Sequence, residues 1–169
     1  KRWCLWINDV DLKDALSINE IKIRIEKVKK FREKAGKVAK SLINRSHQFR
    51  YRHEAKKSFI LIPCTSSANR QYLPIGYFDK KYISMNSAQV INDPPLFIFG
   101  ILSSKTHMIW SKSVGGKLKS DLRYSSKLCY NTFPIIKLEV NEIKKLEDLS
   151  LNIIEEREKY SDQSIAKIY

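Results

Sequence analysis

The chain has 169 residues, of which 43% are hydrophobic and 30% charged, enough apolar material for one globular domain with an added helix. Its net charge of +14 favours a polyanionic partner, and no apolar run approaches the ~18 residues of a membrane span. Three widely spaced cysteines without a CxxC pair argue against a structural zinc site and are typical of reduced, mostly buried thiols in a cytoplasmic protein. No signal peptide opens the chain, and the missing initiator Met is expected of a piece of a longer protein.

The positive charge of the chain lies in two blocks. Residues 22–57 carry fourteen basic and three acidic side chains, and residues 103–127 carry six basic and one acidic side chain. The remaining segments are close to neutral. Because each cation that neutralises a phosphate releases bound counterions, such clustering is typical of a nucleic-acid-binding surface. For the first block alone, a solvated helix face is the alternative interpretation.

The N-terminal segment is predicted to be a strand followed by helix. Residues 2–8 read as a strand, and residues 11–16 suit one short helical turn. Ser17, with Glu20 three positions later, matches a capping box in which Ser17 is the N-cap. Apolar residues then recur at helical spacing, which predicts one long basic helix over about 18–44.

The middle of the chain is predicted to form a small sheet. Residues 45–57 interleave basic and aromatic side chains without a period, which is typical either of a loop along a nucleic-acid backbone or of an exposed connection. Short apolar segments bounded by turn residues follow, and they predict antiparallel or mixed strands at 58–63, 70–78 and 81–91. A proline and a glycine disturb the second of these strands.

The second half of the chain is predicted to be mainly helical. A helix pair over 95–114, broken near Ser103, ends at Gly115-Gly116, where a glycine in the left-handed conformation is expected to follow the last turn. A strand, a turn and a polar helix follow, at 117–125, 131–134 and 138–160. The fold class is therefore α+β, with a small mixed or antiparallel sheet, a long basic N-terminal helix, a central helix pair and a C-terminal helix.

One short motif has the spacing of a catalytic loop. Asp93-Pro94-Pro95-Leu96 matches the Asp/Asn-Pro-Pro-aromatic loop with which adenine-N6 and cytosine-N4 methyltransferases hold a flipped base, except at its last position. Leu96 cannot stack on a base, and none of the five glycines belongs to a glycine-rich loop that would hold S-adenosylmethionine. We therefore interpret the motif as a helix start with a proline at the first helical position.

The other titratable residues offer no metal site and no catalytic triad. The three histidines lie far apart in the sequence, and none has an acidic partner at ligand spacing. Three aspartates near the N-terminus lack the strand-borne pattern of a metal-dependent nuclease, so a polar turn is the simpler interpretation. We assign no catalytic or metal-binding role to these six residues, which are His47, His53, His107, Asp9, Asp11 and Asp14.

The alternating segment 117–125 is the most informative candidate for binding. As one strand, it places Lys117, Lys119, Asp121 and Arg123 on one face. A carboxylate among cations repels phosphate, but an aspartate can accept a hydrogen bond from cytosine N4, while a lysine can donate to guanine O6 and N7 in the major groove. Lys119 and Asp121 are therefore candidates to read the two halves of one G·C pair. A surface Lys–Asp pair is the alternative.

A long, ordered set of short motifs runs through the chain. The motifs are Arg2-Trp3-Cys4-Leu5-Trp6, Ile62-Pro63, Ser66-Ser67, Arg70, Tyr72, Pro74-Ile75-Gly76, Phe99-Gly100-Ile101-Leu102-Ser103-Ser104, His107-Met108, Trp110, Gly116-Lys117-Leu118-Lys119-Ser120-Asp121, Arg123-Tyr124-Ser125 and Tyr130-Asn131-Thr132-Phe133-Pro134. With these motifs the chain resembles the target recognition domain of MmeI-type (type IIL) restriction-modification enzymes, single-chain proteins with adenine-N6 methyltransferase activity. It departs mildly from the family at Lys105 and Lys117, where Arg is common, and at Thr132 and Ile135.

The resemblance implies a division of labour within a larger protein. A separate domain of the parent enzyme, N-terminal to this chain, would bind S-adenosylmethionine, flip an adenine and methylate its N6, with or without a fused nuclease domain. Residues 1–135 would be the target recognition domain and residues 136–169 the start of a C-terminal helical segment. The expected partners are double-stranded DNA and the methyltransferase domain of the same chain, and no cofactor is expected in this part of the protein.

The resemblance also strengthens the assignment of DNA contacts. Lys119 and Asp121 occupy positions similar to the base-reading pair of the family. Further candidates for backbone or base contacts are Arg70, Lys105, Lys112, Lys117 and Arg123, with Ser125, Tyr130 and Asn131 as weaker ones. Two other classes of function stay open: a nucleic-acid-binding adaptor without sequence preference, and a self-contained enzyme, which would have to bind S-adenosylmethionine by itself.

Overall fold

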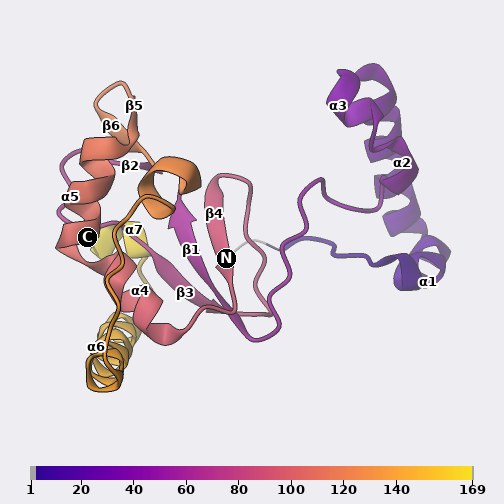
Figure 1. Cartoon of the computed structure of the whole chain (residues 1–169). Coiled ribbons are helices and arrows are strands. Elements are labelled where there is room, and N and C mark those ends of the chain that lie inside the picture. Colours follow the sequence, from indigo (N-terminus) through magenta and orange to yellow (C-terminus); the bar gives the residue numbers. More distant parts are fainter. Residues whose placement is uncertain (1–2, 169) are drawn as a thin grey trace. The chain divides into compact units, whose positions relative to one another are not determined.

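The computed structural model describes residues 3–168 (Figure 1). The chain folds as two compact units, Lys1–Arg52 and His53–Tyr169. None of the helices in the described range is long and apolar enough to cross a bilayer. The predicted α+β class is confirmed, with two small antiparallel sheets, a basic N-terminal helix, a central helix pair and a C-terminal helix.

The first unit is helical. A 3-10 turn (Asp9–Asp11) leads into α1 (Leu12–Ser17), which is followed by α2 (Asn19–Lys34), α3 (Lys37–Lys40) and a second 3-10 turn (Ile43–Arg45). Its only buried hydrophobic side chains, among those described, are those of Ile7 and Ala15. The unit therefore has almost no apolar core of its own.

Two predictions for the start of the chain are wrong. Residues 3–8 form no strand, because no neighbouring segment offers a ladder of hydrogen bonds to them, and residue 2 lies outside the described range. Ser17 ends α1 instead of capping α2, since its Oγ donates to the Asp14 carbonyl at 2.6 Å. Extended backbone at Ile18 then separates the two helices.

The long basic helix is also shorter than the predicted range of 18–44. Ala35 leaves the helical region (φ −87°, ψ −179°), and Gly36 follows it. The guanidinium of Arg32 then donates to three carbonyls further along the chain, those of Leu42, Arg45 and Gln48, at 2.7–2.8 Å. These charge-assisted bonds fold the segment after the break back onto α2.

The second unit contains both sheets. In the first, β1 (Ser58–Pro63) lies between β3 (Gly76–Asp79) and β4 (Ala88–Asn92); in the second, β6 (Asp121–Arg123) lies between β2 (Thr65–Ser66) and β5 (Gly116–Leu118). Cys64 joins the sheets, because its N–H donates to the Ser87 carbonyl and its carbonyl accepts from the Tyr124 N–H, both at 2.9 Å.

The strand over 58–63 is confirmed, whereas the two after it are shorter than predicted. Before β3 the chain forms a tight turn, in which the Ile75 N–H donates to the Leu73 carbonyl around a proline that lacks a ladder donor. Before β4 the chain makes two more turns, closed by hydrogen bonds from Tyr82 to Asp79 and from Ala88 to Met85. The turn before β3 buries Leu73 and Ile75, whereas the apolar side chains of Tyr82, Ile83 and Met85 in the turns before β4 are exposed, so neither apolar run marks a strand.

The helices of the second unit confirm most of the predicted boundaries. The helix pair is α4 (Leu96–Ser103) and α5 (Lys105–Val114), and Ser104 between them caps α5 by accepting from the His107 N–H at 3.1 Å. Pro95 precedes the first turn of α4 and is not its first helical residue. A π-helical turn (Ser126–Tyr130) and α6 (Val140–Glu158) follow, and α7 (Ile165–Ile168) was not foreseen.

One apolar cluster holds this unit together. It combines β-strand residues with side chains from the central helix pair, and consists of Ile60, Ile62, Leu73, Ile75, Phe99, Leu102, Met108, Leu122, Tyr124 and Cys129. Helix α6 packs on α4 where a Cβ added to Gly100 would lie 2.5 Å from Ser150 Oγ, so the absence of a side chain allows the close approach (Figure 1). The C-terminal helix is thus part of the same compact unit as the sheets, and the functional boundary near residue 135 stays a prediction.

Candidate nucleic-acid interface

The segment predicted as one alternating strand is a β-hairpin. Strands β5 and β6 pair antiparallel, and Lys119-Ser120 form the two-residue turn between them. Lys119 has a φ of 57°, in the left-handed region that a tight hairpin turn requires. Three polar residues in succession, Lys119, Ser120 and Asp121, interrupt the polar–apolar alternation at the turn, but the apolar residues at 118, 122 and 124 stay in phase, as they would in one strand.

The hairpin changes which side chains share a face. Residues paired across a ladder point to the same side, so Lys117 lies on the face of its partner Leu122. Asp121 and Arg123 lie on the opposite face of β6, and Lys119 belongs to the turn. The prediction of one shared face for these four polar residues is therefore wrong, although Lys119 and Asp121 remain two residues apart at the end of one hairpin.

The inner face of the hairpin is anchored in the core. Leu122 is 4% exposed and Tyr124 2%. The Tyr124 hydroxyl lies 3.0 Å from His107 Nε2, and the edge of the Phe133 ring meets the imidazole with 4.6 Å between centroids. Burial lowers the pKa of His107 to about 4 and raises the pKa of Tyr124, so both groups are neutral near pH 7. The His107–Tyr124 pair is thus a neutral hydrogen bond inside the apolar cluster.

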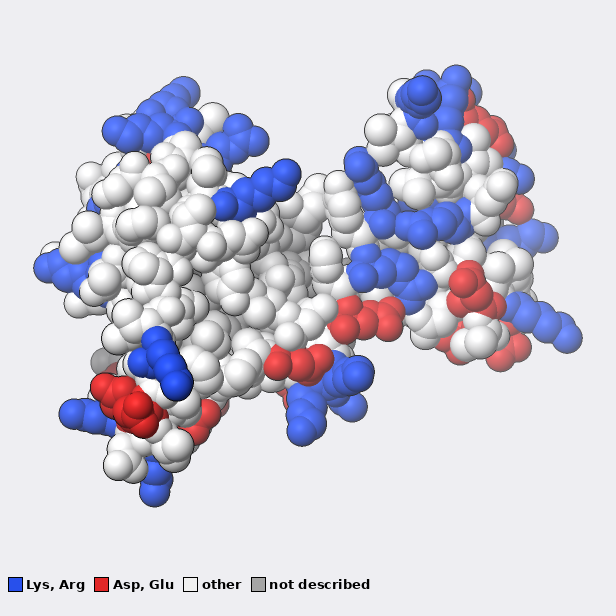
Figure 2. Space-filling view, in the orientation of Figure 1, with Lys and Arg blue, Asp and Glu red and all other residues white. Residues whose placement is uncertain are grey.

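The solvent-exposed side chains in and around the hairpin include several cations. Lys117, Lys119 and Arg123 are all exposed, as is Lys105 at the start of α5. Figure 2 shows Lys and Arg side chains gathered over the end of the unit that β5 and β6 form. An exposed cluster of this kind can bind phosphates without the cost of desolvating a buried charge.

Asp121 is the one acid in this cationic region, and it is held in place. Its Oδ1 accepts a hydrogen bond from the Ala68 N–H at 3.2 Å, and the side chain is half-buried. Within residues 3–168, its other carboxylate oxygen has no hydrogen-bond partner. One oxygen is therefore fixed by the backbone while the other can accept from a ligand.

The remaining predicted contacts divide into two groups. The charged groups of Arg70 and Lys112 form hydrogen bonds within the chain. Arg70 donates to the Ala166 carbonyl at 2.8 Å, and Lys112 donates to the carbonyls of Ala68 and Arg70, each at 2.9 Å. The three weaker candidates lie around the π-helical turn that follows the hairpin: Ser125 and Tyr130 are half-buried and Asn131 is exposed. The structure thus brings Arg70, Lys112 and Asp121 together around one loop, Ser67–Arg70, which sequence reasoning missed.

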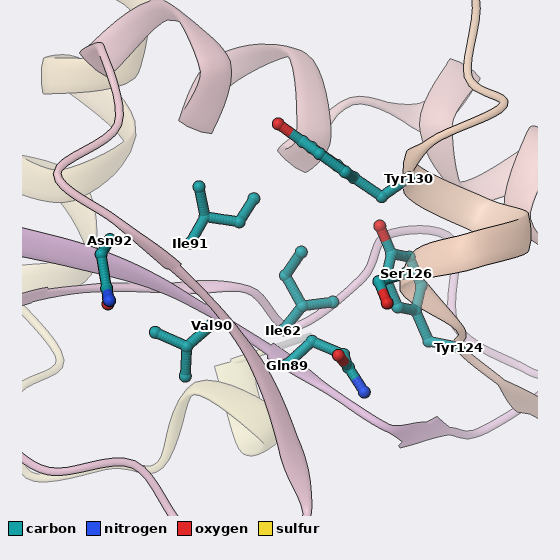
Figure 3. A pocket seen from close by; sticks show the side chains of 8 residues that line it. All are labelled: Ile62, Gln89, Val90, Ile91, Asn92, Tyr124, Ser126 and Tyr130. Carbon is teal, nitrogen blue, oxygen red and sulfur yellow. The ribbon is translucent and has the colours of Figure 1, made fainter. Parts of the chain in front are cut away.

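A cavity of about 360 Å³ lies behind this region (Figure 3). Ile62 and residues 89–92 of β1 and β4 line one side, and Tyr124, Ser126 and Tyr130 line the other. The lining is mostly apolar and contains no charged side chain. The lining therefore contains no carboxylate, histidine or cysteine that could hold a metal ion.

The Asp-Pro-Pro motif has a structural role. The Asp93 carboxylate accepts from the backbone N–H groups of Lys56, Lys57 and Ser58 at 2.9, 2.6 and 3.3 Å, and the first two of these bonds contribute most to lowering its pKa. Both oxygens of Asp93 are thus bonded to backbone amides, and the carboxylate fixes the entry to β1.

One acid–histidine pair was not foreseen from the sequence. His47 Nε2 lies 2.8 Å from Asp9 Oδ1, and the Gln48 amide donates to the same oxygen. The pair orders the first unit, and residues 3–168 contain no group of three or more potential metal ligands.

Comparison with known proteins places this geometry in a family. Residues 1–137 match the family described as MmeI, target recognition domain. The chain belongs to the MmeI target recognition domain family. The resemblance inferred from the short motifs is therefore confirmed.

Two relatives of this target recognition domain cover almost the whole chain. DNA methyltransferase A of Bacillus subtilis (strain 168) is 38% identical over 169 residues, which are 99% of this chain and 19% of that protein. The type IIL restriction-modification enzyme MmeI, whose structure was solved in complex with DNA, matches with a TM-score of 0.90 and 38% identity, over 99% of this chain and 22% of that chain. The chain thus spans about a fifth of the length of each relative.

Proposed function

We propose that this chain reads DNA sequence for a larger DNA adenine-N6 methyltransferase that works in the cytoplasm. The observation that carries the proposal is the match of 99% of the chain, at a TM-score of 0.90, to an MmeI structure that holds DNA. The relative from Bacillus subtilis is itself named a DNA methyltransferase. The hairpin supports this function because it combines exposed cations with one oriented carboxylate.

The methyl-transfer chemistry is assigned to another part of the parent protein. The described residues do not fit S-adenosylmethionine, since the Asp93 carboxylate is bonded to three backbone amides and the cavity lined by Tyr124 and Tyr130 has no carboxylate for a ribose. When bound in its own domain, that cofactor would supply the methyl group. This chain would supply the choice of site.

The tip of the hairpin is the proposed reader. Lys119 extends from the turn and can donate to guanine O6 and N7, while the free oxygen of Asp121 can accept from cytosine N4. Reading by a two-stranded ribbon suits the width of the major groove. The two residues would therefore recognise the two halves of one G·C pair.

The surrounding cations would hold the DNA backbone. Lys105, Lys117 and Arg123 are exposed next to the reader and suit phosphate contacts, which position the duplex and carry no sequence information. Ser125, Tyr130 and Asn131 are secondary candidates on the turn that follows. Arg70 and Lys112 would act mainly by holding the loop Ser67–Arg70 in place. Arg70 ties the loop to the Ala166 carbonyl, and Lys112 donates to two carbonyls of the loop.

The second candidate function is a nucleic-acid-binding adaptor without sequence preference. The first unit favours it, because Lys1–Arg52 contains fifteen basic and six acidic residues on a largely exposed surface. Salt distinguishes the two functions. An adaptor loses affinity for all sequences alike as salt rises, whereas a reader keeps a difference between sequences.

The test uses the full-length parent protein and a set of duplexes that differ by one base pair. Lys119→Ala and Asp121→Ala are expected to alter the base accepted at one position, by roughly 1–3 kcal/mol of discrimination. Competition binding and mapping of methylated adenines both measure this change. Lys37→Ala, an exposed lysine of the first unit, is the control for loss of charge. If both hairpin variants keep the wild-type site preference, the proposed reader is wrong.

A further inference from the structure

The loop Ser67–Arg70 is held from both sides at one residue, Ala68, through the two peptide groups that flank its Cα. The Ala68 N–H donates to Asp121 Oδ1 at 3.2 Å, and the Ala68 carbonyl accepts from Lys112 Nζ at 2.9 Å. The same ammonium donates to the Arg70 carbonyl, also at 2.9 Å. Ala68 therefore connects a lysine of α5 to the acid of the hairpin.

Few residues separate this loop from the sheet that contains Asp121. The loop is closed by a hydrogen bond from the Arg70 N–H to the Ser67 carbonyl at 3.2 Å. It leaves directly from β2, whose residues Thr65 and Ser66 pair with Arg123 and Leu122 of β6. The loop that contains Ala68 is therefore attached directly to the sheet in which β6 carries Asp121.

The position of Lys112 argues against a simple phosphate contact. Its side chain is exposed, yet two of its three ammonium donors are directed at carbonyls of the loop. Bonds from a charged donor are roughly twice as strong as neutral ones, so the loop is a competitive partner for this ammonium. Lys105, in the first turn of the same helix, is also exposed but has no hydrogen-bond partner within the described part of the chain.

We infer that Lys112 is a positioning residue for sequence discrimination: by holding the carbonyl of Ala68, it restrains this residue and its N–H, and so sets the direction in which the Asp121 carboxylate faces the DNA. The inference rests on the proposed function, in which Asp121 reads a base. Lys112 would then act on specificity through Asp121 without touching the base, much as an outer-shell group orients a metal ligand.

The test is a double-mutant cycle in the full-length protein, read out on duplexes that differ by one base pair. Lys112→Met keeps the length of the side chain and removes its donors, Lys112→Arg restores donors, and Asp121→Asn weakens the acceptor. Lys112→Met is expected to relax discrimination roughly three- to tenfold at the same base pair that Asp121→Asn affects. Lys112→Arg is expected to recover most of it, and Lys112→Met is expected to add nothing in the Asp121→Asn background.

Lys105→Met is the matched control, because it removes an equal charge from the same helix. It is expected to weaken binding to every duplex by one common factor, with no change in preference. If Lys112→Met behaves in the same way, or if its effect adds fully to that of Asp121→Asn, the positioning role is wrong. If Asp121→Asn changes the preference at no position, the proposed base reader fails, and the inference fails with it.

Hydrogen exchange in the full-length protein keeps the inference testable should Lys112→Met lower the overall stability. Both Lys112→Met and Asp121→Asn are expected to speed exchange in the peptide that covers Ser67–Arg70, while the peptide that covers α6 stays protected. Unchanged exchange of the loop in both variants contradicts the mechanical link between Lys112 and Asp121.

Discussion

The molecule has two cationic regions that differ in how their charges are held. Helix α2 carries many lysines and arginines, none of its residues is buried, and only Arg32 among its basic residues donates to distant carbonyls. The β5–β6 hairpin carries few cations, but its inner face is anchored by Leu122 and Tyr124 in the apolar cluster. Helix α2 therefore has many cations and few contacts that hold them in place, whereas the hairpin has few cations on a backbone that is anchored in the core.

This difference separates affinity from discrimination. Mobile lysines gain affinity for any phosphate backbone through counterion release. Telling one base pair from another needs donors and acceptors at fixed positions. The hairpin has such fixed groups, whereas α2 does not, so changes in the two regions are expected to have different consequences.

The largest expected effect is a loss of stability when the packing of the hairpin residue Leu122 against Gly115 is disturbed. A Cβ added at Gly115 would lie 2.4 Å from the Ser111 carbonyl oxygen and 2.8 Å from Leu122 Cδ1. Gly115→Ala is therefore expected to lower the free energy of unfolding by about 3 kcal/mol, measured by denaturant unfolding of the 169-residue chain. Gly116→Ala is the matched control, because a Cβ there meets nothing closer than 3.8 Å. Equal stability of the two variants would show that the packing against Leu122 is not tight.

A smaller effect is expected from protonation beneath the hairpin. Burial lowers the pKa of His107 to about 4, whereas an unfolded histidine titrates near 6.5. Between these values the unfolded chain takes up a proton that the folded chain does not, so the stability present above pH 6.5 is lost as the pH falls toward 4. Between pH 6.5 and 4.5 the loss attributable to this group is about 2 kcal/mol.

The check for His107 is the difference in pH dependence between two proteins. His107→Gln is expected to have a flatter unfolding free energy between pH 6.5 and 4.5 than the wild-type chain, whatever its stability at pH 7. Parallel curves for both proteins would mean that the imidazole is charged in the folded state, and that the hydrogen bond to Tyr124 does not depend on a neutral ring.

The smallest effect is expected from a single charge on α2. Lys29 is exposed, and Lys29→Gln in the full-length protein is expected to lower DNA affinity by less than about tenfold and the salt slope by about 0.9 if the side chain meets a phosphate. The loss should be equal for cognate and altered duplexes. A preference that changes with Lys29 would show that α2 also discriminates between sequences, and the contrast with the hairpin would no longer hold.

The sequence predicted the regular parts of the fold because their signals are local. The helix break expected near Ser103 lies at Ser104, which caps α5, and the expected C-terminal helix begins where Glu139 and Glu142 form a capping box. The strand over 58–63 is a short apolar run with a clear end. In each of these cases the residues that decide the structure are neighbours in the chain.

The predictions that were wrong concern segments whose conformation depends on contacts between residues far apart in the sequence. Nothing in the sequence relates Arg32 to the three carbonyls that turn the chain back, or Ala68 to Lys112 and Asp121. Gly115 does end α5, but its φ of −73° shows that it is required for close packing and not for a left-handed turn. The hairpin turn at Lys119-Ser120 lacks the Asn-Gly or Asp-Gly signature from which such turns are usually recognised.

That turn has a consequence for how the proposed DNA specificity could change over evolutionary time. Lys119 holds a left-handed backbone that costs a lysine about 1 kcal/mol and would cost a glycine or an asparagine less. Its side chain supports no other part of the described fold, so replacing it leaves the scaffold intact or even firmer. Asp121 is coupled to a loop and to a helix, and a new residue there disturbs both. If these two residues read bases as proposed, a change of recognised base disturbs the fold less at Lys119, in the turn, than at Asp121, in strand β6.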